Sequence, residues 1–168
     1  MKTPSFTPDL FERLLDTRPQ SGSSQVNSRL SLDTLKDAVA RDLEVLLNTR
    51  AVFPQELLAP CPNCQRSILG YGLPDFAGLS LSSTGDCAVI CRALEQAIAL
   101  HEPRLRNISA TLDGQAGAIN RLDLKITALL MLHPAQEHKE DVSFDAVLQA
   151  SSLHYSIKPS RRPASQRA

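Results

Sequence analysis

The sequence predicts an α+β fold in which two main N-terminal helices pack on a small, mostly antiparallel C-terminal β-sheet. Over residues 31–48 and about 84–100, apolar residues recur mostly at spacings of three and four, the period of an amphipathic helix. From Leu105 onwards the period becomes two, as in half-buried strands. Because the helices come first and the strands follow, the pattern favours α+β over an alternating α/β arrangement.

The composition limits the class of protein. The chain has 168 residues, which fits one domain, and 42% of them are hydrophobic, enough for a core. Its formal net charge is zero, so it lacks the basic surplus of a nucleic-acid-binding protein. No stretch approaches the roughly 20 apolar residues of a membrane span, and the first ten residues do not resemble a signal peptide. We expect a cytoplasmic protein without nucleic acid or direct membrane insertion.

Three regions follow from the distribution of residues along the chain. Residues 1–28 contain a short amphipathic segment, Phe6–Asp16, and a polar linker, Arg18–Ser28, too poor in apolar residues to pack. Residues 29–157 carry the predicted helices and strands. Residues 158–168 form a basic tail with four cationic side chains and no acid, which is most often a solvated chain end.

The first strong helix is expected over Ser31–Asn48, with Ser31 as its N-cap. Its apolar stripe consists of Leu32, Leu35, Val39, Leu43, Leu46 and Leu47. The second runs from about Thr84 to Leu100, after a possible capping box between Ser83 and Asp86. Its stripe consists of Cys87, Ile90, Cys91, Leu94, Ala97 and Ile98. Ala51–Ser83, between the helices, is rich in proline and glycine and is predicted to be irregular.

The strands are predicted from alternation of apolar and polar residues. In the first, Ile108, Ala110 and Leu112 are expected on one face. The turn Asp113–Gly117 should connect it to a long second strand and form a hairpin. The second, third and fourth strands are expected over Leu122–Leu132, Val142–Leu148 and Leu153–Ile157.

The Glu102-Pro103-Arg104 triplet lies where the second helix must give way to the first strand. In one interpretation Pro103 only stops the helix and the two charges are solvated. In the other, a rigid junction holds Glu102 and Arg104 in fixed directions, where an Arg fork pairs well with a carboxylate or carbonyl group. The physical arguments leave both interpretations open.

Three segments together resemble a known family. Arg41–Arg50 (RDLEVLLNTR), Ser67–Asp75 (SILGYGLPD) and His101–Leu105 (HEPRL) are similar to motifs of TssE, the type VI secretion baseplate subunit. That family belongs with the phage baseplate-wedge proteins once called lysozyme-like. The resemblance runs from about Leu10 to Ile157. It departs from the family at His101, where an aromatic residue is usual, and in the Cys61-Pro62-Asn63-Cys64 loop.

The resemblance implies a structural protein of a contractile injection machine, not an enzyme, without a cofactor. Its implied partners are the baseplate subunits TssF and TssG, with TssK and the sheath subunits TssB and TssC, and it would help to start sheath assembly. Its place would be at the cytosolic face of the inner membrane. The implied partner-binding residues are Glu102, Pro103, Arg104, Tyr71, Gly72, Leu73, Pro74 and Asp75.

Two alternative functions come from single features. A peptidoglycan hydrolase would use Glu102 as its acid with Asp75 or Asp86 as the second carboxylate, but few aromatic residues are present to line a sugar cleft. A zinc-binding interaction module would use Cys61, Cys64, Cys87 and Cys91. The second pair falls on a helical apolar stripe, where cysteine is usually a small hydrophobe. We therefore favour no metal, and in a cytosolic protein we expect the four cysteines to be thiols or metal ligands rather than disulfides.

Overall fold

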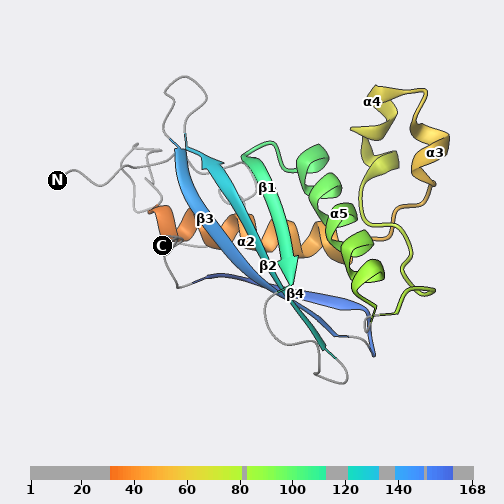
Figure 1. Cartoon of the computed structure of the whole chain (residues 1–168). Helices are drawn as coiled ribbons and strands as arrows, with labels where there is room; N and C mark the ends of the chain where they lie inside the picture. The colour runs from red at the N-terminus through yellow and green to blue at the C-terminus, as the bar shows by residue number, and fades with distance from the viewer. Residues whose placement is uncertain (1–30, 81–82, 113–120, 133–138, 150, 161–168) are drawn as a thin grey trace, which may run out of the picture.

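The computed structural model describes residues 31–80, 83–112, 121–132, 139–149 and 151–160 (Figure 1). The helices and strands are α2 (Leu32–Asn48), α3 (Gln55–Leu58), α4 (Pro62–Gln65), the 3-10 helix η1 (Ile68–Gly70), α5 (Thr84–His101), β1 (Leu105–Leu112), β2 (Arg121–Met131), β3 (Lys139–Gln149) and β4 (His154–Pro159). The expected N-terminal segment, its linker and the turn Asp113–Gly117 lie outside the described residues. None of the described helices is long and apolar enough to span a membrane.

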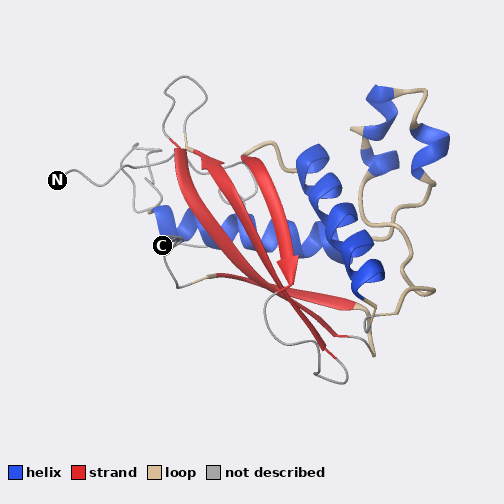
Figure 2. Ribbon diagram, in the orientation of Figure 1, coloured by secondary structure: helices blue, strands red, loops and turns tan. Residues whose placement is uncertain are grey.

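The four strands form one antiparallel sheet in the order β1-β2-β3-β4, so each strand pairs with its neighbour in sequence. The two long helices precede this meander, and the predicted α+β class is confirmed (Figure 2). β4 continues to Pro159, so the first residues of the expected basic tail belong to a strand. Beyond it, the Ser160 N–H donates to the Ser143 carbonyl at 2.8 Å.

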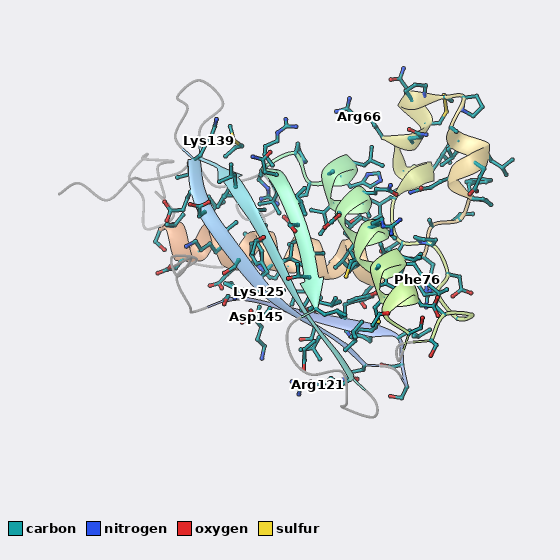
Figure 3. The ribbon with its side chains drawn as sticks, in the orientation of Figure 1. Arg66, Phe76, Arg121, Lys125, Lys139 and Asp145 are labelled. Carbon is teal, nitrogen blue, oxygen red and sulfur yellow. A yellow bond between two sulfur atoms is a disulfide. The ribbon has the colours of Figure 1, made fainter. Side chains whose placement is uncertain are left out.

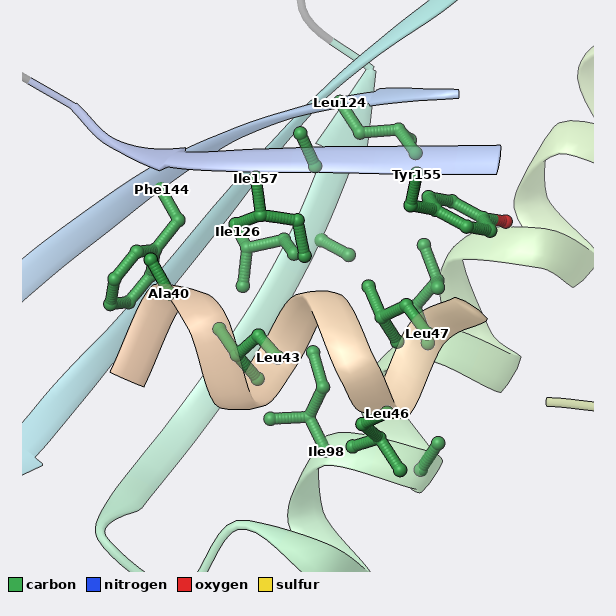
Figure 4. Close-up of a cluster of buried hydrophobic side chains, with 14 of the residues drawn as sticks. Ala40, Leu43, Leu46, Leu47, Ile98, Leu124, Ile126, Phe144, Tyr155 and Ile157 are labelled. Atoms are coloured by element: carbon green, nitrogen blue, oxygen red, sulfur yellow. The ribbon is translucent and has the colours of Figure 1, made fainter. Parts of the chain in front are cut away.

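Both long helices pack against the sheet, α2 mainly along β4 and α5 mainly along β1, and they also contact each other. From Leu124 to Leu130 in β2 and from Val142 to Leu148 in β3 every second side chain faces the helices and is buried, which is the predicted period of two. Each such large apolar side chain contributes roughly 1.5–3 kcal/mol. Figure 4 shows this core, to which the helices and strands contribute Leu43, Leu46, Ile98, Leu124, Ile126, Phe144 and Ile157.

The face predicted for β1 is confirmed, but one further residue joins it. Ala110 and Leu112 stand opposite Ile126 and Leu124 of β2, so they share the core face, although Leu112 at the end of the strand is 42% exposed. A β-bulge lies between Arg106 and Ser109, where Asn107 adopts a positive φ of 50°. A bulge places two residues of one strand opposite one of its partner, so the buried Leu105, five positions before Ala110, also faces the core. Asparagine is among the few residues that tolerate this backbone conformation.

The helix caps agree with the sequence in most respects. Ser31 Oγ accepts from the Thr34 N–H at 3.2 Å, and Ser83 Oγ accepts from the Asp86 N–H at 3.3 Å. Only half of the expected capping box forms, because the Asp86 carboxylate accepts from the Ser80 N–H at 2.9 Å instead of the Ser83 N–H. That bond ties the preceding loop to the start of α5.

At the edge of the sheet, β4 pairs with side chains of α2. Alternate residues of an edge strand turn their N–H and C=O groups away from the neighbouring strand. The Tyr155 N–H donates to Asn48 Oδ1 and the Tyr155 carbonyl accepts from Asn48 Nδ2, each at 2.8 Å. The Ile157 N–H donates to Glu44 Oε2 at 2.8 Å. We call Glu44, Asn48 and these two β4 residues the β4 clasp.

The residues between the core positions of the strands are largely polar. On the central strands Lys125 of β2 is paired in register with Asp145 of β3, and the next strand places Lys158 beside Asp145 (Figure 3). Side chains alternate between the two faces of a strand, so these residues lie on the face opposite the helices. An antiparallel sheet with one packed face and one polar face matches the expectation from sequence.

Candidate functional site

The Glu102-Pro103-Arg104 triplet connects α5 to β1. The Glu102 N–H still donates to the Ile98 carbonyl at 2.8 Å, which makes Glu102 the C-cap of α5. The Arg104 carbonyl already accepts from the Met131 N–H of β2 at 2.8 Å. Pro103, which has no N–H to donate, is exposed between them. As predicted, α5 ends just before Pro103, and β1 begins at Leu105 just after the triplet.

The two charges of the triplet are paired with each other. Glu102 Oε1 accepts from Arg104 Nε at 2.8 Å and from the Arg104 backbone N–H at 3.2 Å, and Oε2 accepts from Arg104 Nη2 at 2.7 Å. Arg104 Nη2 also donates to Asp42 Oδ2 on α2. Hydrogen bonding to Glu102, the largest effect, holds the pKa of Arg104 above its usual value. Glu102 is only 6% exposed, so this bidentate pair is largely enclosed.

Tyr71 and His101 pack beside this ionic cluster. Their rings make an edge-to-face contact with centroids 5.3 Å apart, and His101 Nε2 is 2.9 Å from the Gly70 carbonyl. Burial, followed by the negative charges of Asp42 and Glu102, raises the pKa of Tyr71. His101 thus fills the position where the resembled family has an aromatic residue, and it makes a ring contact there.

Gly72 is where the loop must approach α2's C-terminal extension closely. Its φ is 111°, and a Cβ there would lie 2.5 Å from the Thr49 carbonyl oxygen, so only glycine fits without displacing backbone. The next residue, Leu73, donates its N–H to that carbonyl at 2.8 Å and accepts from the Ala51 N–H at 2.8 Å. These two bonds form a parallel bridge between Arg50 and Leu73, whose side chain is buried.

Asp75 completes the loop with one ion pair and one turn contact. Its Oδ1 accepts from Arg50 Nη1 at 2.9 Å and from the Ala77 N–H at 3.1 Å. The side chains of Arg50 and Asp75 are 46% and 72% exposed, so this pair contributes little stability. The Arg50–Asp75 ion pair is better suited to holding the loop in one orientation than to stabilising the fold.

Three segments that are far apart in sequence therefore meet at one place, which we call the motif junction. It consists of Asp42 and Arg50 from the first segment, Tyr71 to Asp75 from the second, and Glu102 to Arg104 from the third. The last two groups were predicted as site residues from the sequence, whereas Asp42 and Arg50 were not. Both lie in the Arg41–Arg50 segment, so that motif carried the signal that could have identified them.

The carboxylates considered for a hydrolase serve separate structural purposes. Glu102 pairs with Arg104, Asp75 with Arg50, and Asp86 accepts from the Ser80 N–H. A glycosidase requires two carboxyl groups that flank one substrate bond. Here each of the three is engaged by a different neighbour within the fold.

The cysteines do not form the four-ligand cluster that a zinc module would need. Cys61, the N-cap of α4, and Cys64 within α4 form a disulfide, which corrects the expectation that the cysteines are thiols or metal ligands rather than disulfides. Cys87 and Cys91 are outside this disulfide, and burial raises the pKa of both thiols. Within the described part of the chain, no group of three or more cysteine, histidine or acidic residues is placed to hold a metal ion.

The fold and the junction together define a class: a small α+β protein in which ion pairs and backbone hydrogen bonds join three distant segments at one surface. A family model described as "Baseplate wedge protein gp25" matches residues 33–135, well over half of the chain. The chain belongs to this baseplate wedge family. The match covers α2, the junction loop, α5, β1 and β2.

No curated protein sequence matches the chain significantly. A chain in a solved structure described as "The baseplate complex from the type VI secretion system" is similar, with 18% identity, a TM-score of 0.46, and coverage of 69% of this chain and 95% of that chain.

Proposed function

We propose that this protein is a structural subunit of a type VI secretion baseplate. In this proposal it joins the wedge complex through TssF and TssG, lies near TssK and the sheath subunits TssB and TssC, and helps to start sheath assembly at the cytosolic face of the inner membrane. It performs no catalysis. Membership of the baseplate wedge family supports the structural role, and the three TssE-like sequence segments support the type VI assignment.

The observation that carries the proposal is the convergence of those three segments at the motif junction. Arg104 is 28% exposed and Asp42 is 56% exposed, so the ionic cluster is accessible at its Asp42 side. Pro103, on the third segment, and Pro74, on the second, are also exposed. The side chains of Arg104 and Asp42 are held by ion pairs within the protein before any partner arrives, which reduces the entropy lost on binding.

In this proposal the partner-binding surface is therefore the motif junction as a unit and not a single residue. Glu102 acts indirectly: it orients Arg104, while the exposed flank of Arg104, Pro103 and the Tyr71–Asp75 loop contact the wedge subunits. Because Arg104 has five N–H donors in a planar fork, it can retain Glu102 and still donate to a partner carbonyl or carboxylate.

The test is co-purification with TssF and TssG from cells carrying the whole secretion cluster. Arg104→Ala and Glu102→Ala should each weaken recovery of the complex by about tenfold or more, as expected for a hydrogen-bonded charge at an interface. Thermal unfolding of each variant checks that the fold survives. Lys125→Ala, a charge removal on the polar sheet face, is the matched control and should co-purify normally. If both junction variants recover the complex as well as the unmodified protein does, the triplet has no role in partner binding and only ends the helix.

A further inference from the structure

Residues 52–70, which we call the α3–η1 segment, are held in place by few buried side chains. The segment contains α3, α4 and η1, and in Figure 1 α3 and α4 lie beyond α5, away from the sheet. Within this range, all of which the structure describes, only Leu58 is buried. Leu57 and Ile68 are 68% and 80% exposed. A segment with so little buried apolar surface opens readily, so a covalent constraint has more effect here than in the core.

The Cys61–Cys64 disulfide is the covalent constraint of this segment. It joins the N-cap of α4 to a residue within the four residues of that helix. A helix of this length is not stable by itself, so α4 depends on the link. Both cysteines are half-buried, and neither is enclosed in the core, so a thiol in solution can reach the disulfide.

Hydrogen bonds of Ser67, the N-cap of η1, connect the disulfide to the junction loop. Ser67 Oγ donates to the Cys64 carbonyl at 2.7 Å and accepts from the Leu69 N–H at 3.2 Å. The Ser67 backbone N–H donates to the same Cys64 carbonyl at 3.2 Å, and its own carbonyl accepts from the Gly70 N–H at 3.1 Å. Cys64 is therefore two hydrogen bonds away from Gly70, where the junction loop begins.

Gly70 transmits the position of α4 to the α5–β1 connection. It packs so closely on Gln65, the last residue of α4, that a Cβ at Gly70 would overlap the Gln65 carbonyl oxygen. The Gly70 carbonyl lies 2.9 Å from His101 Nε2, and the His101 ring contacts the Tyr71 ring. His101 directly precedes Glu102 of the triplet. A displacement of α4 would therefore be felt by both the loop and the triplet of the motif junction.

We propose that Cys61 and Cys64 form a reversible redox site that regulates the motif junction. Cysteine pairs with this CxxC spacing exchange readily with external thiols, and disulfides of cytosolic proteins are usually transient or redox-sensing. The inference rests on the proposed function, because the cytosolic position of the baseplate supplies the thiol reductant. In the oxidised protein α4 supports Gly70 and the loop. In the reduced protein the α3–η1 segment opens more often, so partner binding must order it at a greater entropic cost.

The reaction is thiol–disulfide exchange. The thiolate of a reductant attacks one cysteine sulfur, the S–S bond breaks, and the other cysteine leaves as a thiolate that takes up a proton. A second reductant thiol then breaks the mixed disulfide and releases the first cysteine as a thiol. Two electrons and two protons have entered the pair, and the two reductant thiols have become a disulfide. The reverse exchange with a disulfide oxidant restores the link.

Glutathione tests the chemistry. The purified protein is equilibrated with mostly reduced or mostly oxidised glutathione, quenched with acid, alkylated in denaturant and analysed by mass spectrometry. Cys61 and Cys64 should convert together, to two thiols in the reduced mixture and to their disulfide in the oxidised one. A disulfide that persists in mostly reduced glutathione is a permanent structural link and overturns the proposal. So does a pair that stays reduced in the oxidised mixture.

Amide hydrogen exchange, followed by NMR, tests whether the redox state reaches the junction. Reduction should speed exchange at Gly70 and Tyr71 by about tenfold, because the constraint on local opening is lost, whereas the core residue Leu43 should keep its rate. Cys61→Ser should show the fast rate in either glutathione mixture. Cys91→Ser removes a thiol outside the disulfide and should respond as the unmodified protein does. Equal rates at Gly70 and Tyr71 in the two redox states overturn the proposed regulation.

Affinity for the purified TssF–TssG complex tests the functional consequence. The reduced protein should bind at least fivefold more weakly than the oxidised protein, as expected for a modest coupling between two sites. Cys61→Ser should bind with the lower affinity in both mixtures, which excludes an effect of glutathione on TssF–TssG. Equal affinity of the two redox states overturns the regulatory role. If the unmodified protein binds TssF–TssG in neither state, the proposed function fails, whereas the glutathione and exchange measurements still decide the redox inference.

Discussion

Helix α2 uses its polar residues in two different ways on its two flanks. On one flank, Asp42 reaches the Glu102–Arg104 pair, and the contact is between charges that are partly open to solvent. On the other, Glu44 and Asn48 bind the backbone of β4, where the hydrogen bonds are part-buried. The two flanks lie within seven residues of each other, yet their contributions should differ because solvent screens one and not the other.

The two flanks of α2 should therefore have different roles. The β4 clasp satisfies backbone groups that would otherwise be unpaired at the sheet edge, so it should act mainly on stability. It also closes that edge against another strand. The Asp42 end of the motif junction leaves charged groups accessible, so it should act mainly on orientation and recognition. The following predictions test this comparison.

Breaking the clasp should have the largest effect. Asn48→Ala removes both partners of Tyr155 and leaves one N–H and one C=O unpaired. The free energy of unfolding should fall by about 2 kcal/mol or more. Urea unfolding followed by circular dichroism measures it, with Ser156→Ala as the control. A loss below about 0.5 kcal/mol, the range of an ordinary surface substitution, would show that water replaces the amide without cost.

Neutralising the enclosed end of the junction should have an intermediate effect. Glu102→Gln keeps an oxygen that can accept from Arg104 but removes the charge beside a guanidinium that is 28% exposed. The free energy of unfolding should fall by about 1–2 kcal/mol, less than for a fully buried pair because Asp42 and solvent remain. The same urea experiment measures it. A loss larger than that of Asn48→Ala would reverse the proposed ranking of the two flanks.

Neutralising the exposed end should have the smallest effect. Asp42→Asn alters a carboxylate that is 56% exposed, so the free energy of unfolding should change by less than about 1 kcal/mol. Raising the salt concentration should shrink the difference further. If Asp42→Asn costs as much as Asn48→Ala and salt does not reduce the loss, both flanks are structural.

The same substitution has a second, spectroscopic consequence. The negative charge of Asp42 helps to raise the pKa of Tyr71, after the larger effect of burial. Removing that charge favours the phenolate, so the pKa of Tyr71 should fall while staying above its ordinary value. Ultraviolet absorbance during a pH titration measures it, and the Tyr71→Phe variant identifies which tyrosine is responsible. An unchanged titration would place Asp42 too far from the hydroxyl to act on it.

Hydrophobic periodicity predicted α2, α5, β2 and β3 well, because one face of each is buried along its whole length and leaves a regular pattern. In β1 it missed that Leu105 faces the core together with Ala110, because the bulge at Asn107 interrupts the alternation with a backbone conformation that a period of two does not encode. The candidate site residues Tyr71–Asp75 and Glu102–Arg104 were predicted from the resemblance to a family. Asp42 and Arg50 were not, because their roles depend on partners far away in the chain.

The sequence by itself determined the order of helices and strands, the faces they bury and the stop at Pro103, since these follow from local periodicity and from the chemistry of single residues. Only the tertiary structure decided which charges meet. Arg104 pairs with Asp42 across 62 positions of sequence, and Tyr155 with Asn48 across 107. Such pairs form because α2 packs along β4 and contacts α5, which brings distant polar groups within hydrogen-bonding distance. The two charges of the triplet, Glu102 and Arg104, could be solvated on the evidence of the sequence, whereas in the folded protein they pair with each other.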